Sequence, residues 1–205
     1  MINLGILISG RGSNMDAILA AVKAGRMPAI RPAVVISNKL DAAGLKVASE
    51  KYGVKTRAVL PEGARGWEYD RRVVEALEEA GVTPDGGLVC LAGFMRIISP
   101  EFVRHYKMRI LNIHPALLPS FPGLHAQRQA IEYGVKVSGC TVHFVDEGVD
   151  SGPVILQKTV PVMEGDSEEA LSARILEQEH HSLPEAVRLF SEDRLKIEGR
   201  KVRII

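Results

Sequence analysis

The sequence predicts an α/β protein with a doubly wound, mostly parallel sheet, folded as a single domain over residues 1–205. Short β-branched runs alternate with longer amphipathic stretches through residues 1–105, which is the pattern of parallel strands joined by crossover helices. The chain is long enough to bury one large core, and no repeat, low-complexity tract or linker divides it. We expect a regular half over residues 1–105 and a half with a mixed sheet over residues 106–205.

The expected elements of the first part follow from where its apolar runs begin and end. Strands are expected over residues 3–9, 33–37, 55–60, 87–92 and 109–114. Helices are expected between the strands, and each is followed by a glycine, the residue that most readily ends a helix. They cover residues 14–24, 42–52 and 67–80.

The second half is less regular. We expect a helix over residues 125–133 and two strands over 140–145 and 154–160, joined by a loop rich in turn residues and acids. Ser167 is expected to cap a further helix, which Pro184 either kinks or ends. The tail from Arg194 to Ile205 is expected to form a short basic hairpin around Gly199.

Composition excludes several classes of protein. The 26 basic and 25 acidic residues leave a net charge of +1, so no nucleic-acid partner is expected. No segment approaches the roughly 20 apolar residues of a membrane span, and the first residues lack the basic region of a signal peptide, so we expect a cytoplasmic protein. No group of His, Cys, Asp or Glu has metal-site spacing, so no metal is expected. Cys90 and Cys140 stand in strand-like contexts that suit buried thiols.

Two polar residues, Asn112 and His114, interrupt the apolar strand expected over residues 109–114. Side chains alternate along a strand, so these two share one face while Leu111 and Ile113 point into the protein. Pro115 stops the strand and leaves both polar groups at its carboxyl edge, where α/β sheets hold their sites. Alone, each is explained as a strand-end amide or a core histidine; together they fit an oxyanion donor and a general acid.

The segment from Ser9 to Asn14 joins the first expected strand to the first helix and contains Gly10 and Gly12. Glycine there lets backbone N–H groups approach an anion, which a helix N-terminus also favours. The segment lacks the third glycine of the dinucleotide fingerprint, and its spacing suits a single phosphate. The alternative is a tight turn capped by Ser13 or Asn14.

Asp150 lies in the acidic loop, beside Ser-Gly-Pro. If the strands around this loop lie beside the strand that carries His114, the Asp150 carboxylate faces the imidazole and raises its pKa. Otherwise Asp150 only forms a turn. His143 shares a strand face with Thr141, and either faces the same cleft or is a buried structural histidine. No serine or cysteine has a nucleophile-elbow setting, which argues against a covalent acyl-enzyme.

Taken together, the motifs resemble those of the phosphoribosylglycinamide formyltransferases, the folate-dependent family of purine synthesis. They run through nearly the whole chain in this order: Ser9-Gly-Arg-Gly-Ser-Asn14, Ser37-Asn-Lys39, Leu91-Ala-Gly-Phe-Met-Arg-Ile-Ile-Ser99, Leu111-Asn-Ile-His-Pro115, Leu118-Pro, Phe121-Pro-Gly-Leu-His125, Val142-His-Phe-Val145, Asp150-Ser-Gly-Pro-Val-Ile155 and Gln178-Glu-His180. Each motif is modest, but their order and spacing make coincidence implausible.

The resemblance implies the formyltransferase fold and direct transfer of the formyl group of 10-formyltetrahydrofolate to the amine of glycinamide ribonucleotide, through a tetrahedral intermediate, in de novo purine (IMP) biosynthesis. Carried over by position, Asn112 and His114 stabilise and protonate the developing oxyanion. Asp150 raises the pKa of His114 and helps to move the amine proton. The resemblance also implies small-molecule substrates and a monomer or homodimer.

The same resemblance assigns the two halves. Residues 1–105 are the nucleotide- and phosphate-binding half, with Gly12, Ser13 and Asn14 on the phosphate. Residues 106–205 are the folate-binding and catalytic half, with Glu179 reaching toward the glycinamide end. The implied folate contacts are Met95, Arg96, Ile97, Ile98, Asn112, Asp146, Glu147, Gly148, Val149 and Asp150. The family's arginine before Tyr-Asp is displaced here to Arg65.

Several alternatives share part of this pattern. Methionyl-tRNA formyltransferase adds a carboxyl-terminal tRNA domain, and formyltetrahydrofolate deformylase adds an amino-terminal regulatory domain; we expect neither here. Sugar-nucleotide formyltransferases give no reason for the Gly12-Ser13-Asn14 loop to hold a monophosphate. A non-catalytic folate- or nucleotide-binding protein is the alternative of another class, but binding alone does not need Asn112, His114 and Asp150 together.

Overall fold

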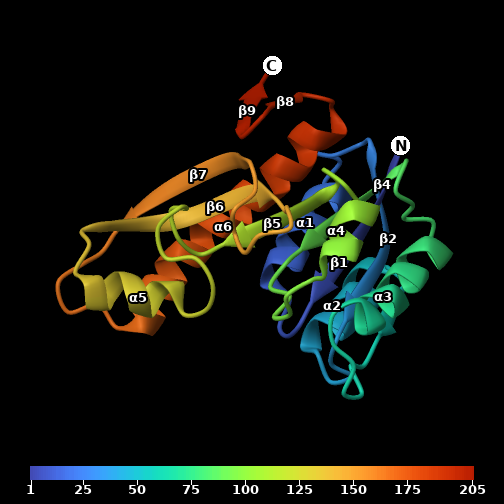
Figure 1. Cartoon of the computed structure of the whole chain (residues 1–205), viewed down its shortest axis with the longest axis horizontal. Coiled ribbons are helices and arrows are strands. Elements are labelled where there is room, and N and C mark those ends of the chain that lie inside the picture. Colours follow the sequence, from blue (N-terminus) through green and yellow to red (C-terminus); the bar gives the residue numbers. More distant parts are fainter.

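The structure, a computed structural model covering residues 1–205, is built on one nine-stranded sheet (Figure 1). The strand order is β3-β2-β1-β4-β5-β6-β7-β9-β8. The strands are β1 (Ile2–Ile8), β2 (Ile30–Ser37), β3 (Thr56–Ala58), β4 (Gly87–Leu91), β5 (Ile110–His114), β6 (Val137–Phe144), β7 (Val154–Pro161), β8 (Leu195–Glu198) and β9 (Lys201–Ile204). The helices are α1 (Ser13–Lys23), α2 (Ala43–Tyr52), α3 (Trp67–Glu79), α4 (Pro100–His105), α5 (Ala126–Tyr133) and α6 (Glu168–Ser191).

The sheet changes character at β5. The strands from β3 to β5 pair in parallel, whereas β6 runs antiparallel to both β5 and β7. The prediction of a doubly wound, mostly parallel sheet with a mixed second half is confirmed. The basic hairpin expected at the carboxyl terminus is also present as β8 and β9, with Gly199 in its turn at φ 63°.

Helices cover both faces of the sheet. One buried apolar cluster includes side chains of α1, α2, α5 and α6, and the other includes those of α3 and α4. Strand residues alternate between the two clusters: Leu111 and Ile113 belong to the first, and Ile110 to the second. Because both faces are covered, the strand ends are the places where polar groups can form a site.

Two elements, α4 and β3, differ from the prediction, and at α6 the structure excludes one of two alternatives. The short helix α4 was not expected, because its six residues are too few to show a period, although Ser99 caps it and Pro100 opens it. Helix α6 continues through Pro184, so the alternative that Pro184 ends the helix is excluded; Leu183 and Val187 on either side are both fully buried in the core. Strand β3 is only three residues long, because it is a partly exposed edge strand that pairs with β2 alone.

Candidate active site

Strand β5 carries Asn112 and His114 to the carboxyl edge of the sheet. Leu111 and Ile113 are buried in the core cluster on the opposite face, as the alternation predicts. The register with β6 sets Asn112 directly opposite His143. The His114 side chain is itself buried, with 4% of its surface exposed, so the strand ends inside a covered site rather than at an open surface.

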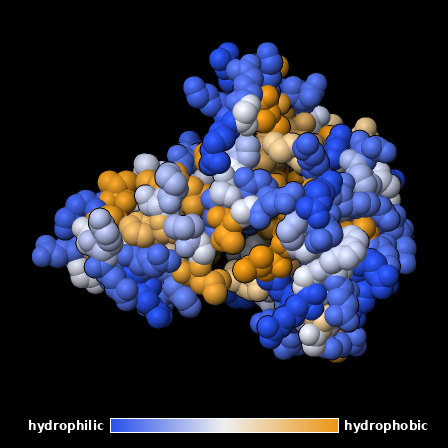
Figure 2. All heavy atoms as spheres, in the orientation of Figure 1, coloured by the Kyte–Doolittle hydropathy of each residue, from blue (hydrophilic) through white to orange (hydrophobic).

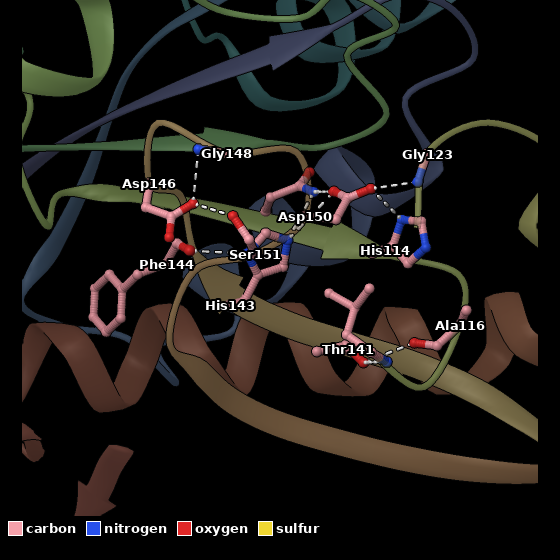
Figure 3. Close-up of polar contacts among 12 residues, drawn as sticks. His114, Ala116, Gly123, Thr141, His143, Phe144, Asp146, Gly148, Asp150 and Ser151 are labelled. Carbon is pink, nitrogen blue, oxygen red and sulfur yellow. Dashed lines mark hydrogen bonds and ion pairs between the residues drawn. The ribbon is translucent and has the colours of Figure 1, made fainter. Parts of the chain in front are cut away.

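The loop between β6 and β7 brings Asp150 to this strand end (Figure 3). One Asp150 oxygen, Oδ2, lies 3.2 Å from Nδ1 of His114 and accepts the backbone N–H of Gly123 at 2.8 Å. The other, Oδ1, accepts from the Asn112 amide nitrogen at 3.4 Å and lies 3.7 Å from Nε2 of His143. The predicted juxtaposition of His114 and Asp150 is therefore confirmed, while their catalytic roles stay predictions.

Both ring nitrogens of His114 face oxygen acceptors. Nε2 lies 2.8 Å from the carbonyl oxygen of Phe121, and Nδ1 faces the Asp150 carboxylate. A neutral imidazole has a single N–H, so only the protonated ring donates in both directions.

Asp150 acts on the pKa of His114 in the expected raising direction, but the net shift is downward. Burial lowers the pKa of His114, and the Asp150 charge and the Phe121 carbonyl, which act in the raising direction, do not fully offset it. The two oxygen acceptors thus suit the protonated His114 ring, and the lowered pKa makes that ring a stronger acid.

Asp150 is kept ionised by its neighbours. Burial raises the pKa of Asp150, but the nearby His143 ring, the hydrogen bond from the Gly123 N–H and the charge of His114 outweigh it and leave the pKa lowered. The carboxylate is therefore available as a proton acceptor. Its backbone has φ 49°, a left-handed conformation that is uncommon outside glycine and that the surrounding contacts must hold.

His143 completes the cluster and was not assigned a role by the sequence. It is almost fully buried, and its Nδ1 lies 2.8 Å from the carbonyl oxygen of Phe144, so Nδ1 carries the proton. Its Nε2 then accepts from the Asn112 amide nitrogen at 3.1 Å. Both N–H bonds of Asn112 are thus directed at protein groups, and the contact to Asp150 is the longer of the two.

The glycine loop before α1 has the geometry of an anion site. Gly12 occupies the N-cap position with φ 71°, and no side chain caps the helix. The alternative of a turn capped by Ser13 or Asn14 is therefore wrong. The first backbone N–H groups of α1 have no partner within the helix and are open to an anion.

Asn14 and Glu179 form a buried pair that joins α1 to α6. The Asn14 amide nitrogen donates to Oε2 of Glu179 at 2.8 Å, and both side chains are buried. Burial raises the pKa of Glu179, and the Asn14 hydrogen bond opposes that effect. The Asn14 Nδ2 group is thus directed at Glu179.

Exposed apolar side chains lie on two segments beside this cluster. Met95 and Ile97, between β4 and α4, are 66% and 80% exposed, and Val149 in the loop between β6 and β7 is 56% exposed. Figure 2 shows apolar atoms around a hollow near the centre of this face, over these two segments. The first of these segments is linked to the glycine loop, because the Ser9 hydroxyl accepts the Met95 N–H at 2.7 Å.

Not all of the expected folate residues point outward. The Arg96 guanidinium lies 4.2 Å from the centre of the Tyr69 ring and donates to the carbonyl of Ala64 at 3.1 Å, so it supports the segment from within. Asp146 accepts from Ser151 and from the Gly148 N–H inside its own loop.

Two charged side chains at the rim have different surroundings. Glu147 pairs with Arg104 at 3.3 Å. Arg65 is exposed and makes no hydrogen bond or ion pair, so its side chain is free to turn toward a ligand.

The comparisons with known proteins identify the family. A sequence profile of the formyl transferase family matches residues 2–187. The chain is 46% identical to phosphoribosylglycinamide formyltransferase of Escherichia coli over 95% of its own length and 90% of that protein. The chain belongs to the formyl transferase family.

Solved structures of formyl transferases agree with this assignment. Glycinamide ribonucleotide transformylase 1 of Symbiobacterium toebii superposes with a TM-score of 0.94 at 53% identity, covering 100% of this chain and 94% of that one. A formyltetrahydrofolate deformylase of Pseudomonas syringae superposes with a TM-score of 0.90 at 27% identity, and the match covers 66% of that chain. The predicted resemblance to the phosphoribosylglycinamide formyltransferases, and with it the formyltransferase fold, is confirmed.

No group of three or more His, Cys, Asp or Glu side chains is arranged to hold a metal ion. None of the helices is long and apolar enough to cross a membrane.

Proposed function

We propose that this chain transfers the formyl group of 10-formyltetrahydrofolate to the amine of glycinamide ribonucleotide, as a one-carbon transferase of purine biosynthesis. The observation that carries the proposal is the convergence of Asn112, His114 and Asp150 at the end of β5. An amide donor, an acid and a carboxylate within one partly buried cluster suit acyl transfer through a tetrahedral intermediate. Relatives named for this activity are 46% and 53% identical to the chain.

In the proposed mechanism, Asn112 stabilises the negative charge that forms on the formyl oxygen as the amine attacks. To do so it releases its longer contact, at 3.4 Å to Asp150, and keeps the contact at 3.1 Å to His143. His143 thereby orients the amide while one N–H turns to the substrate. An oxyanion donor of this kind is worth about 10²- to 10³-fold in turnover.

His114 and Asp150 handle the protons. The protonated imidazole supplies a proton to the oxyanion, and burial, which lowers the pKa of His114, favours that transfer. Asp150, once released by Asn112, takes the proton lost by the attacking amine. As the intermediate collapses, His114 takes back the hydroxyl proton and the formyl C=O re-forms. The carbon–nitrogen bond to the folate breaks, and Asp150 passes the amine proton to that folate nitrogen.

We place the ribonucleotide phosphate on the N-terminus of α1, against the backbone of Gly12, Ser13 and Asn14. The absence of any side-chain cap supports this, since the helix leaves its first N–H groups to an anion. The Asn14–Glu179 pair lies next to this site, where the Glu179 carboxylate suits the amine end of glycinamide. Residues 1–105 thus supply most of the ribonucleotide site.

We place the folate between the segment of residues 95–98 and the loop of residues 146–150. Exposed apolar side chains at Met95, Ile97 and Val149 beside a buried polar cluster fit a flat aromatic ring. Arg65, which has no protein partner, suits a folate carboxylate. Cytoplasmic location, the absence of a nucleic-acid partner, and a monomeric or homodimeric state stay predictions.

A turnover assay with and without the acceptor tests the proposal. Purified protein is mixed with 10-formyltetrahydrofolate, and tetrahydrofolate is followed in the presence and in the absence of glycinamide ribonucleotide. We expect tetrahydrofolate only when the ribonucleotide is present. Release at the same rate without it would make the protein a deformylase, and tight folate binding with no turnover would make it a binding protein.

A further inference from the structure

The carboxyl-terminal hairpin reaches the loop that carries Asp150. The Arg200 guanidinium, between β8 and β9, donates to the carbonyl oxygen of Ser151 at 2.8 Å. Beside this contact, β9 joins the main sheet through a single parallel bridge, Val154 to Lys201. The formyl transferase profile ends at residue 187, so the hairpin lies outside the part of the chain that it matches.

The loop between β6 and β7 is fixed at its end and strained at its centre. A side chain at Gly152 would come within 1.8 Å of the Phe144 carbonyl oxygen, so the backbone here packs directly on β6. Asp150, two residues earlier, has φ 49°, a conformation that persists only where the surroundings impose it. Ser151 lies between the two and offers its carbonyl to Arg200.

We infer that Arg200 is a positioning residue for the transfer reaction: its hydrogen bond to Ser151 holds the left-handed turn that aims Asp150 at His114. The inference rests on the proposed function. The hairpin thus affects catalysis indirectly. Arg200 contacts the backbone next to Asp150, but it does not contact Asp150 or His114. Small misplacements of a catalytic group are costly in rate, so a single contact of this kind is measurable.

Three variants of the full chain separate this role from general stability. Arg200→Ala removes the contact and Arg200→Lys keeps a donor and a charge. Arg203→Ala is the matched control, because Arg203 lies in the same hairpin and pairs only with Glu198, at 3.1 Å. Steady-state rates are measured across pH for both substrates, together with amide hydrogen exchange of residues 146–153.

For Arg200→Ala we expect kcat to fall by about 3- to 10-fold, with an unchanged KM for the ribonucleotide, whose site lies on another loop. The acidic limb of the rate profile should move to higher pH, because Asp150 loses part of its contact with His114 on β5 and His143 on β6. Exchange of residues 146–153 should quicken. Arg200→Lys should keep most of the rate, and Arg203→Ala should match the unmodified chain.

Two results would overturn the inference: an unchanged kcat and pH profile in Arg200→Ala, or equal losses in Arg200→Ala and Arg203→Ala, which would make the hairpin merely stabilising. If the unmodified chain shows no transfer, the proposed function fails, but the exchange of residues 146–153 still tests the contact. Unchanged exchange in Arg200→Ala would then refute the positioning of the loop.

Discussion

The carboxylate of Asp150 lies 3.2 Å from Nδ1 of His114, and the same carboxylate accepts the backbone N–H of Gly123 at 2.8 Å. These two contacts join the loop after β6 to the end of β5, at His114, and to the segment after β5, at Gly123. An acid and a carboxylate are thereby held in one orientation within a covered site.

Replacing Asp150 by Asn should abolish most of the turnover. The amide is similar in size but cannot accept the proton of the attacking amine, so we expect kcat to fall about 10²- to 10⁴-fold. The acidic limb that belongs to the pair should disappear from the rate profile. Turnover by stopped assay and circular dichroism of the variant are the measurements. A folded variant with an unchanged pH profile would remove Asp150 from the reaction.

Replacing Asn112 by Ala should lower kcat by about 10²- to 10³-fold, because the oxyanion loses its donor. The KM for the ribonucleotide should stay near its original value, since that substrate is held at the N-terminus of α1. His143→Asn is a useful companion, because it removes the Nε2 that holds the Asn112 amide at 3.1 Å. A smaller loss than in Asn112→Ala is expected there, and a loss-free Asn112→Ala enzyme would contradict the oxyanion role.

Much of this site could be predicted from local patterns, but not its energetics. The two-residue spacing of Asn112 and His114 sets their common face wherever the segment is a strand, and the structure agrees. The role of His143 depends on the register between β5 and β6, which the local sequence does not specify. The net direction of the His114 pKa shift depends on burial, a property of the whole fold, which outweighs the expected raising effect of Asp150.

The same dependence on the whole fold applies to the helices. Pro184 disfavours a helix locally, but buried neighbours on both sides keep α6 continuous. Helix α4 is too short for its period to be detected, although Ser99 and Pro100 form a recognisable start signal. Gly12 occupies the cap position that Ser13 or Asn14 would take in an ordinary turn, because the backbone there is left-handed.

The free energy of unfolding should fall on mild acidification, and protonation of His114 should account for a measurable part of that loss. Burial lowers the pKa of His114 in the folded protein, so below about pH 6.5 the unfolded chain binds the proton preferentially. The free energy of unfolding is then lost at up to about 1.4 kcal/mol per pH unit, until the folded pKa is reached. Urea unfolding at several pH values measures this slope.

The variant His114→Asn should flatten the slope without abolishing it. His180, whose pKa is also lowered by burial, contributes over the same range and remains in the variant. Asp150, with a lowered pKa, adds a separate loss only below about pH 3.9, where the unfolded carboxylate takes up its proton. An identical slope in the variant and the original chain would show that His114 titrates alike in both states.

Replacing Glu179 by Gln should separate stability from substrate binding. Burial raises the pKa of Glu179, so its charged form destabilises the fold as the pH rises above about 4.3. The neutral amide of Gln removes that cost, and its oxygen still accepts the hydrogen bond from Asn14. We expect a higher Tm at pH 7. The KM for the ribonucleotide should rise about 10-fold or more, because an ion-assisted contact to its amine is lost. A variant with a lower Tm and an unchanged KM would contradict both expectations.

Replacing Gly12 by Ala tests the phosphate site, and Gly25→Ala is its matched control. The two glycines flank the same helix with nearly equal backbone angles, φ 71° and 72°, so a side chain costs each about 1–2 kcal/mol of conformational energy. At Gly25 the added Cβ meets nothing within 4 Å, whereas at Gly12 it lies 3.2 Å from Gly44.

Both variants should therefore lose stability. Only Gly12→Ala should also weaken the binding of the ribonucleotide, because its Cβ and the displaced backbone disturb the N–H groups that face the phosphate. We expect the KM for the ribonucleotide to rise about 10-fold or more in Gly12→Ala and to stay unchanged in Gly25→Ala. Inorganic phosphate should inhibit the unmodified chain competitively against the ribonucleotide and inhibit Gly12→Ala less. An equal change of KM in both variants would show that the effect comes from the stability of α1, and would refute the proposal that this loop binds the phosphate.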